Sequence, residues 1–450
     1  MTLRTLSRVP RGLAVRQTLE SGSALSAGAF VIGLILFGYR GWDGRQSLMP
    51  LDVVFVQQSL DPSTPFSGLN TPFGQFDVLR QFSGYLHVVA RLFVELFEFA
   101  PFSMLPTLIF VVATLIWAGC GWGIFIGVRS VAGAASGLVA ATSFALLPPS
   151  NIILLSQLNA LQWPLLVVCV VLIATDLSPR SVGGQLVVVS VFFATAASAA
   201  LAFIPLFMLA WRNVARRERL MAPWSLTRWS LIAMTAPFLV QIVAYTRQPG
   251  RRAEDLNPLT QIAKEAAYIP KVLLPGSLRG TVTDSLSVGA LALLIIIVAG
   301  LLTVIVGAVL TSRASASKTA TVIVELVTVG ACTGVISVTM NGNLNHQYLM
   351  IPFASLWIAI VLSIDALTRD PARRRVGIIG ALFAVGVFAL SGAGTWNKDL
   401  HDPFFAQTRA ANLAESLAIA QRICELTPNT SADASGTGLG LPCPIIVTLR

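Results

Sequence analysis

The sequence predicts an all-α polytopic membrane protein with about eleven transmembrane helices. Of the 450 residues, 55% are hydrophobic and only 12% are charged, whereas about a quarter of the residues in a soluble domain are charged. The mean hydropathy is +0.75. Apolar runs of about twenty residues recur along the chain, and a helix of that length crosses a bilayer. These three observations together define the class.

Other classes are excluded by the same patterns. The strands of a membrane β-barrel alternate in polarity over about ten residues, and these runs do not alternate. Surface attachment is excluded because the runs are continuous and have no polar face. The net charge of +10 does not indicate a nucleic-acid partner, because the basic residues occupy short loops where membrane topology explains them.

The apolar runs give the expected helices in order. They span residues 27–41, 105–128, 130–148, 160–176, 184–198, 200–212, 229–246, 286–311, 320–339, 349–366 and 376–393. The stretch 184–212 is divided into two helices because arginines flank both of its ends, and arginine clusters favour the cytoplasm. The chain must therefore cross and return, and the Ala/Ser-rich stretch 194–202 is the expected break.

Positive charge orients the chain in a cell membrane. Residues 1–26 carry four arginines and form an expected cytoplasmic segment. No small-x-small cleavage site follows the first apolar run, so we interpret that run as a retained anchor. Residues 27–393 form the transmembrane domain, and residues 394–450 form a polar tail on the outer face. The outer loops 42–104 and 247–285 are long while the inner loops are short, so any active site is expected outside.

The first outer loop is too apolar to lie free in water. We expect Val53–Phe55 and Val88–Phe99 to form amphipathic helices in the membrane interface. Helical spacing places Arg91 and two glutamates on one side of the second stretch. Leu92, Leu96 and Phe99 are then expected to face lipid.

The five cysteines fall into two groups. Cys120, Cys169 and Cys332 lie inside expected membrane helices, where free cysteine behaves as a small apolar residue. Cys424 and Cys443 lie in the outer tail and would face an oxidising compartment, so a disulfide between them is predicted. The tail is expected to hold an amphipathic helix near 405–425 and an extended end at 444–447. No metal-binding spacing occurs, and no metal is expected.

Asp52 is the principal candidate for chemistry. It stands within an apolar stretch, where an acid is costly unless it faces a polar cavity or a partner. Burial would raise its pKa and suit it to general-base work. The alternative is that Asp52 caps the N-terminus of a short interfacial helix, and chemistry alone leaves both open. Asp43, at the exit of the first membrane run, is either a second candidate acid or a turn residue.

Candidate cations come later in the chain. The loop 247–285 holds Arg247, Arg251, Arg252, Lys264, Lys271 and Arg279. They could clamp a phosphate, and the alternative is a solvated loop paired with its own acids. His346 and Tyr348 open a membrane helix from outside, either to bind a sugar or phosphate or to anchor the helix at the interface. Glu325 lies near the cytoplasmic end of its run, where it can snorkel.

Four short motifs occur in order along the first part of the chain. They are Asp52 with Phe55, Phe82–Arg91 containing Gly84-Tyr85-Leu86-His87, Leu147-Pro148-Pro149, and Asn159 with Trp163. These motifs resemble those of a group of bacterial GT-C-like membrane glycosyltransferases, and the cysteine-bearing tail is also similar. Leu51 stands where that group has a second acid, and Val53 stands where it has glycine.

The resemblance implies a GT-C-like fold in a bacterial cell membrane. It implies transfer of a hexose or pentose from a polyprenyl-phosphate donor to an envelope glycan or lipid acceptor on the outer face. Asp52 would be the catalytic base, and either Asp43 or Asp77 would supply the second carboxylate. The implied phosphate-binding candidates are Arg251, Arg252, Lys271, Arg279, His346 and Tyr348. The implied cavity and acceptor residues are Tyr85, His87, Arg91, Asn159 and Trp163. No cofactor is expected, because a lipid phosphate can leave without a metal when its charge is held.

Two other functions stay open. The first is a transporter or flippase of a lipid-linked saccharide, which the near absence of charged residues within the spans counts against. The second is a noncatalytic GT-C-like subunit of an envelope-assembly complex, which the loss of the second acid favours. Membrane lipid is a partner in all three, and nucleic acid in none.

Overall fold

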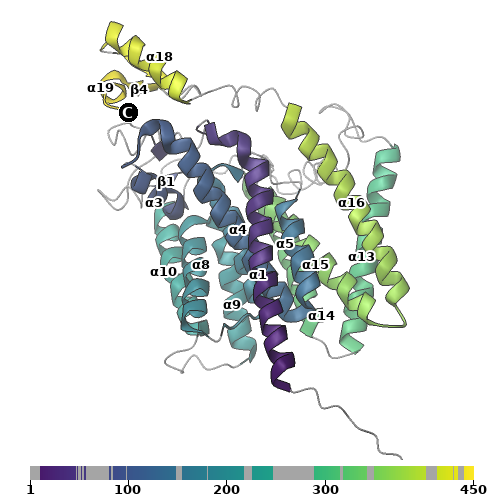
Figure 1. Cartoon of the computed structure of the whole chain (residues 1–450). Helices are drawn as coiled ribbons and strands as arrows, with labels where there is room; N and C mark the ends of the chain where they lie inside the picture. The colour runs from purple at the N-terminus through teal and green to yellow at the C-terminus, as the bar shows by residue number, and fades with distance from the viewer. Residues whose placement is uncertain are drawn as a thin grey trace, which may run out of the picture.

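The protein forms a bundle of long helices (Figure 1). The computed structural model describes residues 11–46, 48, 52, 55–56, 81–82, 85–97, 99–147, 155–179, 181–216, 226–246, 288–314, 318–341, 349–401, 413–428, 430–433 and 440–449. A helix lies in each apolar run expected from the sequence. These helices are α1 (Arg11–Gly41), α4 (Leu105–Ala132), α5 (Ala134–Ala145), α7 (Gln162–Thr175), α8 (Val182–Ser198), α9 (Phe203–Arg216), α10 (Leu226–Thr246), α13 (Val288–Ala314), α14 (Lys318–Asn341), α15 (Met350–Arg369) and α16 (Arg374–His401). The expected all-α membrane class is thus confirmed.

Within the described residues, 6 helices are long and apolar enough to cross a membrane. These spans are Ser23–Gly41, Phe102–Ala132, Leu226–Ala244, Ile295–Ser312, Met350–Arg369 and Arg374–Gly392. The apolar helices α5, α7, α8 and α9 are shorter than a full crossing. About eleven crossings therefore stays a prediction, because a short helix spans about 1.5 Å per residue and needs about twenty residues to cross.

The predicted break between α8 and α9 is confirmed. α8 ends at Ser198, Ala199 is extended, and the 3-10 turn η5 (Ala200–Ala202) leads into α9. Near the end of α9, Arg212 donates hydrogen bonds to the carbonyls of Ile173 and Ala174 at the end of α7. α9 therefore returns to the end of the bundle from which α8 departs.

Charged side chains join the end of α7, the end of α9 and the start of α14 at this end of the bundle. The guanidinium of Arg212 pairs with the carboxylate of Glu325 on α14. Asp176, the left-handed residue that ends α7, lies 3.9 Å from Arg212 and 3.5 Å from Lys318. Lys318 also donates to the carbonyl of Thr175 at 2.9 Å. Cations thus satisfy the last carbonyls of α7, and Glu325 has a partner, where the sequence indicated only snorkelling.

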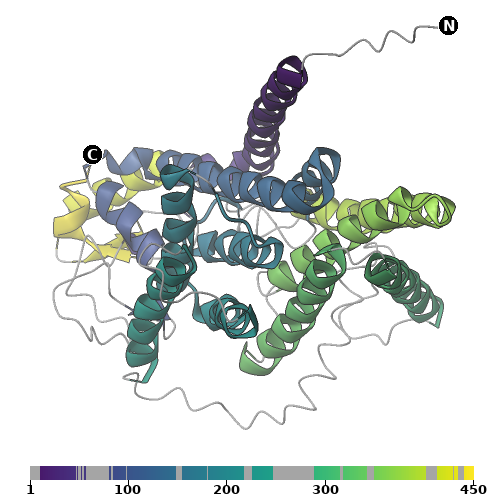
Figure 2. The ribbon, with the colours of Figure 1, turned by 90° about the horizontal axis from the view of Figure 1, so that it is seen from below.

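α7 is the central helix of the bundle. All of its residues from Gln162 to Thr175 are buried, and it packs against α4, α8 and α15. In both views α8 and α10 lie on one side of α4, and α13 and α16 lie on the other (Figures 1 and 2). Gly123 permits close packing of α4 on α7, because a Cβ there would lie 2.5 Å from Val168. Small residues at helix contacts are typical of membrane bundles.

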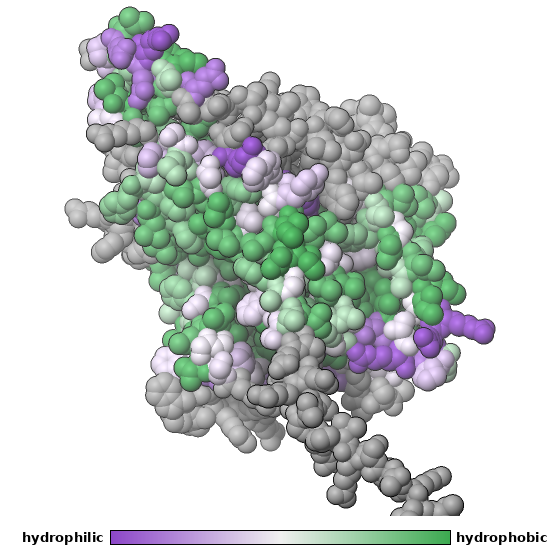
Figure 3. All heavy atoms as spheres, in the orientation of Figure 1, coloured by the Kyte–Doolittle hydropathy of each residue, from purple (hydrophilic) through white to green (hydrophobic). Residues whose placement is uncertain are grey.

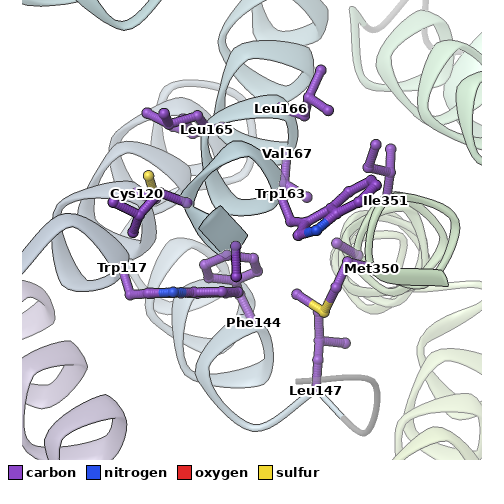
Figure 4. Packing of buried hydrophobic residues seen from close by; sticks show 14 of the residues in the cluster. Trp117, Cys120, Phe144, Leu147, Trp163, Leu165, Leu166, Val167, Met350 and Ile351 are labelled. Atoms are coloured by element: carbon purple, nitrogen blue, oxygen red, sulfur yellow. The ribbon is translucent and has the colours of Figure 1, made fainter. Parts of the chain in front are cut away.

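Aromatic side chains fill the core beside α7. The Trp117 ring stacks on Phe144 with centroids 5.6 Å apart, and Phe37 of α1 lies 5.3 Å from Trp117. Figure 4 shows Trp163 of α7 beside Met350 and Ile351 of α15. The core therefore joins α1, α4, α5, α7 and α15 through contacts that are distant in sequence.

The tail forms a small cross-linked unit. It contains α18 (Leu413–Leu426), the strands β3 (Ser431–Asp433) and β4 (Gly440–Pro442), and α19 (Cys443–Ile446). The predicted disulfide joins Cys424 and Cys443, whose Cα atoms are 5.1 Å apart. The expected extended end at 444–447 is wrong: Pro444 occupies the first turn of α19, where the fixed φ of proline favours a helix. α16 also continues to His401, past the expected boundary at 393.

Candidate functional site

Asp52 is fully buried at the end of the bundle opposite Arg212. Its Oδ1 accepts hydrogen bonds from the N–H groups of Leu158 at 3.1 Å and Asn159 at 3.3 Å, and its Oδ2 accepts from Leu158 at 3.2 Å. Those N–H groups open the turn η4 (Asn159–Leu161), which continues into α7. Asp52 therefore caps a helix start, whereas the alternative from the sequence was a cap on its own short interfacial helix. The capped helix is not its own but one that begins 106 residues later.

The environment of Asp52 changes its titration. Burial raises the pKa of the carboxyl group from 3.8 to about 7, and the hydrogen bonds from the Asn159 and Leu158 backbones lower it in part. Burial acts on the charged form, which loses its hydration, while the donors stabilise that form. A group with a pKa about 7 exchanges protons near neutrality, which suits general-base catalysis.

The first loop places a histidine and an arginine against the ring of Phe55. Phe55 follows Asp52 by three residues and is fully buried. The His87 ring lies 5.4 Å from the Phe55 ring, and the Arg91 guanidinium carbon lies 4.9 Å from its centroid. His87 and Arg91 are 1% and 2% exposed, so both motifs contribute buried polar groups to one cluster. Cation–π contact stabilises the arginine there.

Arg91 is held by the amphipathic helix α3 (Val88–Phe97). Ala90, Arg91 and Val94 are buried, while Leu92 and Leu96 are half exposed and Phe99 is 92% exposed. This matches the exposed apolar face predicted for the stretch. An apolar face beside a membrane bundle is typical of an interfacial helix.

Asn159 and Trp163 enter the cluster from the start of α7. Asn159 is 5% exposed, and its side-chain oxygen has no hydrogen-bond partner among the described residues. Trp163, one turn further on, packs toward α15 (Figure 4). Asn159 therefore contributes a buried side-chain amide oxygen, while its backbone N–H donates to Asp52.

Two polar residues that the sequence analysis missed fix the first loop to the bundle. The hairpin β1 (Gln81–Phe82) and β2 (Tyr85–Leu86) precedes α3. The Leu86 N–H donates to Gln241 Oε1 at 2.7 Å, and Gln241 Nε2 donates back to the Leu86 carbonyl at 3.1 Å. The Val89 N–H donates to Ser198 Oγ at 3.1 Å. A glutamine inside the apolar run 229–246 is costly without a partner. That signal could have identified Gln241 from the sequence.

Replacing Gln241 with Leu is expected to destabilise the protein by about 2 kcal/mol, because both backbone groups of the buried Leu86 lose their partner. Hydrogen exchange of the peptide covering 85–97 should become faster. Gln185→Leu is the matched control, since Gln185 makes a part-buried bond to Pro179 at the other end of α8. Equal stability and exchange in Gln241→Leu and the wild type would refute this role.

Several expected site residues lie outside the described part of the chain. They are Arg251, Arg252, Lys271, Arg279, His346 and Tyr348. Only the backbones of Asp43, in the turn η1 (Trp42–Gln46), and Tyr85, in β2, are described. The phosphate-binding role of the cations of 247–285 therefore stays a prediction. Among the described residues, no three His, Cys, Asp or Glu side chains group to hold a metal ion.

Comparison with known proteins gives no family. No protein-family model matches the chain, and a search of curated proteins finds no match either.

Proposed function

We propose that this protein is a GT-C-type membrane glycosyltransferase that uses a polyprenyl-phosphate sugar. One observation carries the proposal: Asp52, with a pKa raised to about 7, lies buried beside Phe55 and the His87–Arg91 segment at the start of α7. Three motifs that resemble those of GT-C enzymes meet there. Perturbed carboxyl groups are typical of catalytic sites.

In the proposed reaction Asp52 removes the proton from an acceptor hydroxyl. The acceptor oxygen then forms a bond to the anomeric carbon of the sugar, and the bond from that carbon to the phosphate oxygen breaks. The lipid phosphate leaves with the electron pair, and a cation of the loop 247–285, such as Arg251 or Arg279, neutralises its charge. The buried amide oxygen of Asn159 would accept a hydrogen bond from the acceptor.

The proposed setting is the outer face of a bacterial cell membrane. The N-terminus lies in the cytoplasm, the tail outside, and about eleven helices cross the bilayer. The disulfide Cys424–Cys443 supports this side for the tail, because disulfides persist in oxidising compartments. Asp52 lies at the end of the bundle away from the Arg212 cluster, and arginine clusters favour the cytoplasm.

A noncatalytic subunit is the second candidate. The observation that favours it is the capping role of Asp52, whose carboxylate is 0% exposed and already accepts backbone hydrogen bonds. In that case Asp52 would serve the fold alone.

The two candidates differ in a transfer assay. The purified full chain is incubated with radiolabelled polyprenyl-phosphate mannose, arabinose or glucose and an envelope glycan extract. Appearance of label in the glycan without any other protein is the expected result. Binding of the donor without transfer would favour the noncatalytic subunit, and movement of labelled lipid across vesicles without transfer would favour a flippase.

A further inference from the structure

Positive charge is concentrated at the turn that joins α15 to α16. Four exposed arginines lie there within seven residues: Arg369, Arg373, Arg374 and Arg375. The turn lies at the same end of the bundle as Arg212, because α14 leaves that end at Lys318 and α15 returns to it. Hydrophilic side chains gather at the lower end of α16, next to a hydrophobic face (Figures 1 and 3).

The first two of these arginines have acidic partners. Arg369 pairs with Asp365 at 2.9 Å and also donates to the Ala132 carbonyl at the end of α4. Arg373 lies 3.9 Å from Asp370. These two side chains are therefore explained by contacts within the bundle.

Arg374 and Arg375 have no such contacts. Neither makes a hydrogen bond or an ion pair with any residue that the structure describes. Both lie in the first turn of α16, which contains no acidic residue. The N-terminus of a helix carries partial positive charge, so cations are disfavoured there and an anion is favoured. Arginines that only oriented the chain in the membrane would fit the last turn of α15 better, where the helix dipole favours cations.

The two arginines lie at the membrane boundary. Arg374 begins the candidate span Arg374–Gly392. Ile379 and Leu382 follow Arg375 by four and seven residues, so the three share one face of the helix. Ile379 is 66% exposed and Leu382 is 71% exposed. Apolar side chains exposed on a spanning helix face acyl chains, and arginines at the end of a span extend to the headgroups. Two unpaired cations therefore stand where lipid phosphates lie.

Close packing fixes which face of α16 meets the lipid. A Cβ at Gly377 would lie 2.7 Å from the Thr368 side chain of α15. A Cβ at Gly380 would lie 2.9 Å from Val304 of α13. Small residues at such contacts hold helices close together in membrane bundles. The glycine face of α16 is thus turned to α13 and α15, which leaves the face of Ile379 and Leu382 outward.

We propose that Arg374 and Arg375 bind the phosphate of one anionic phospholipid, whose acyl chain lies along Ile379 and Leu382. Guanidinium groups suit phosphate oxygens. A soluble phosphate would leave the apolar face unused, and a zwitterionic lipid carries its own cation beside the phosphate. The site lies at the end of the bundle opposite Asp52, so this role does not depend on sugar transfer.

Native mass spectrometry of the detergent-purified full chain tests the proposal. Dioleoyl-phosphatidylglycerol and dioleoyl-phosphatidylcholine are titrated separately and in competition. One phosphatidylglycerol should bind about 25-fold more tightly than phosphatidylcholine, because each arginine near an anionic headgroup contributes about fivefold. Glycerophosphoglycerol, the same headgroup without acyl chains, should not displace phosphatidylglycerol at equal concentration.

Variants of the two arginines assign the site. Arg374→Gln or Arg375→Gln alone should lower the preference for phosphatidylglycerol about fivefold, and the double variant should remove it. Both side chains are exposed and unpaired among the described residues, so the double variant should keep the wild-type melting temperature. The charge-matched control is Arg228→Gln with Arg422→Gln, which removes exposed arginines from α10 and α18 and should keep the preference.

Four results would overturn the proposal. They are equal affinity of the wild type for the two phospholipids, an unchanged preference in the folded double variant, an equal loss in the control, and displacement of phosphatidylglycerol by glycerophosphoglycerol. The last result would indicate a site for soluble phosphates.

Discussion

Replacing Asp52 with Asn is expected to lower the rate of sugar transfer by about 100-fold or more, because a positioned general base contributes about 10² to 10⁴ in rate. Asn has nearly the same shape, and its oxygen can still accept from the Leu158 and Asn159 N–H groups. The variant should therefore fold. The measurement is kcat of the purified variant, with its melting temperature as the check on folding.

The raised pKa of Asp52 also predicts the direction of two pH effects. Its pKa rises from 3.8 to about 7 on folding, so the folded state binds the proton more tightly than the unfolded state. This stabilisation is complete below about pH 4 and is lost as the pH rises through about 7. Transfer has the opposite dependence, since a base must be deprotonated: kcat should rise with pH and level off above about 7.

The exposed Glu415 on α18 provides a control, and Glu415→Gln should leave the melting temperature unchanged. Asp52→Asn should lose the pH dependence of melting between about 4 and 7. Full transfer activity in a folded Asp52→Asn protein would contradict the role of Asp52 as a general base and leave it as a helix cap alone.

Replacing Arg212 with Met is expected to destabilise the bundle by about 3 kcal/mol, because it removes the cation that pairs with the partly buried Glu325 carboxylate. The side chains of Arg212 and Glu325 are 11% and 26% exposed. Arg212 also donates to the carbonyls of Ile173 and Ala174, which would lose their partner. The measurement is the midpoint of unfolding in SDS.

Removing the carboxylate as well should restore part of that loss. The double variant Arg212→Met with Glu325→Met replaces the pair by apolar side chains, a change that is often close to neutral. Arg373→Met is the control at the same end of the bundle: its side chain is 45% exposed, its pair with Asp370 spans 3.9 Å, and its hydrogen bonds to Gly307 and Thr311 are exposed. Such exposed pairs contribute about 0 to 1 kcal/mol. A double variant less stable than Arg212→Met would contradict the pairing.

Local patterns in the sequence predicted much of the fold. Apolar runs located the helices, and the arginines around 184–212 required the break that the structure has between Ser198 and Phe203. Helical periodicity predicted the exposed face of Leu92, Leu96 and Phe99. These features depend on residue type at short spacing, which a sequence displays directly.

Contacts made by backbone atoms could not be predicted in this way. The partner of Asp52 is a pair of N–H groups, which every residue except proline carries, so nothing in the sequence marks Leu158. Gln241 likewise bonds to the backbone N–H and carbonyl of Leu86, which lies 155 residues away, and nothing in the sequence marks Leu86 as its partner. The central position of α7 was also hidden, because a helix that is apolar all round has no periodicity to show what surrounds it.

The complete burial of α7 has a consequence for biogenesis. The ribosome makes α7 after α4 and before α14 and α15, all of which pack against α7, so the side of α7 that α14 and α15 cover faces lipid until those helices are inserted. Its fourteen residues from Gln162 to Thr175 contain no charge, which lets lipid solvate them in the interval. A chain that stalls before α15 would therefore expose that side of α7 to the quality-control proteases of the membrane.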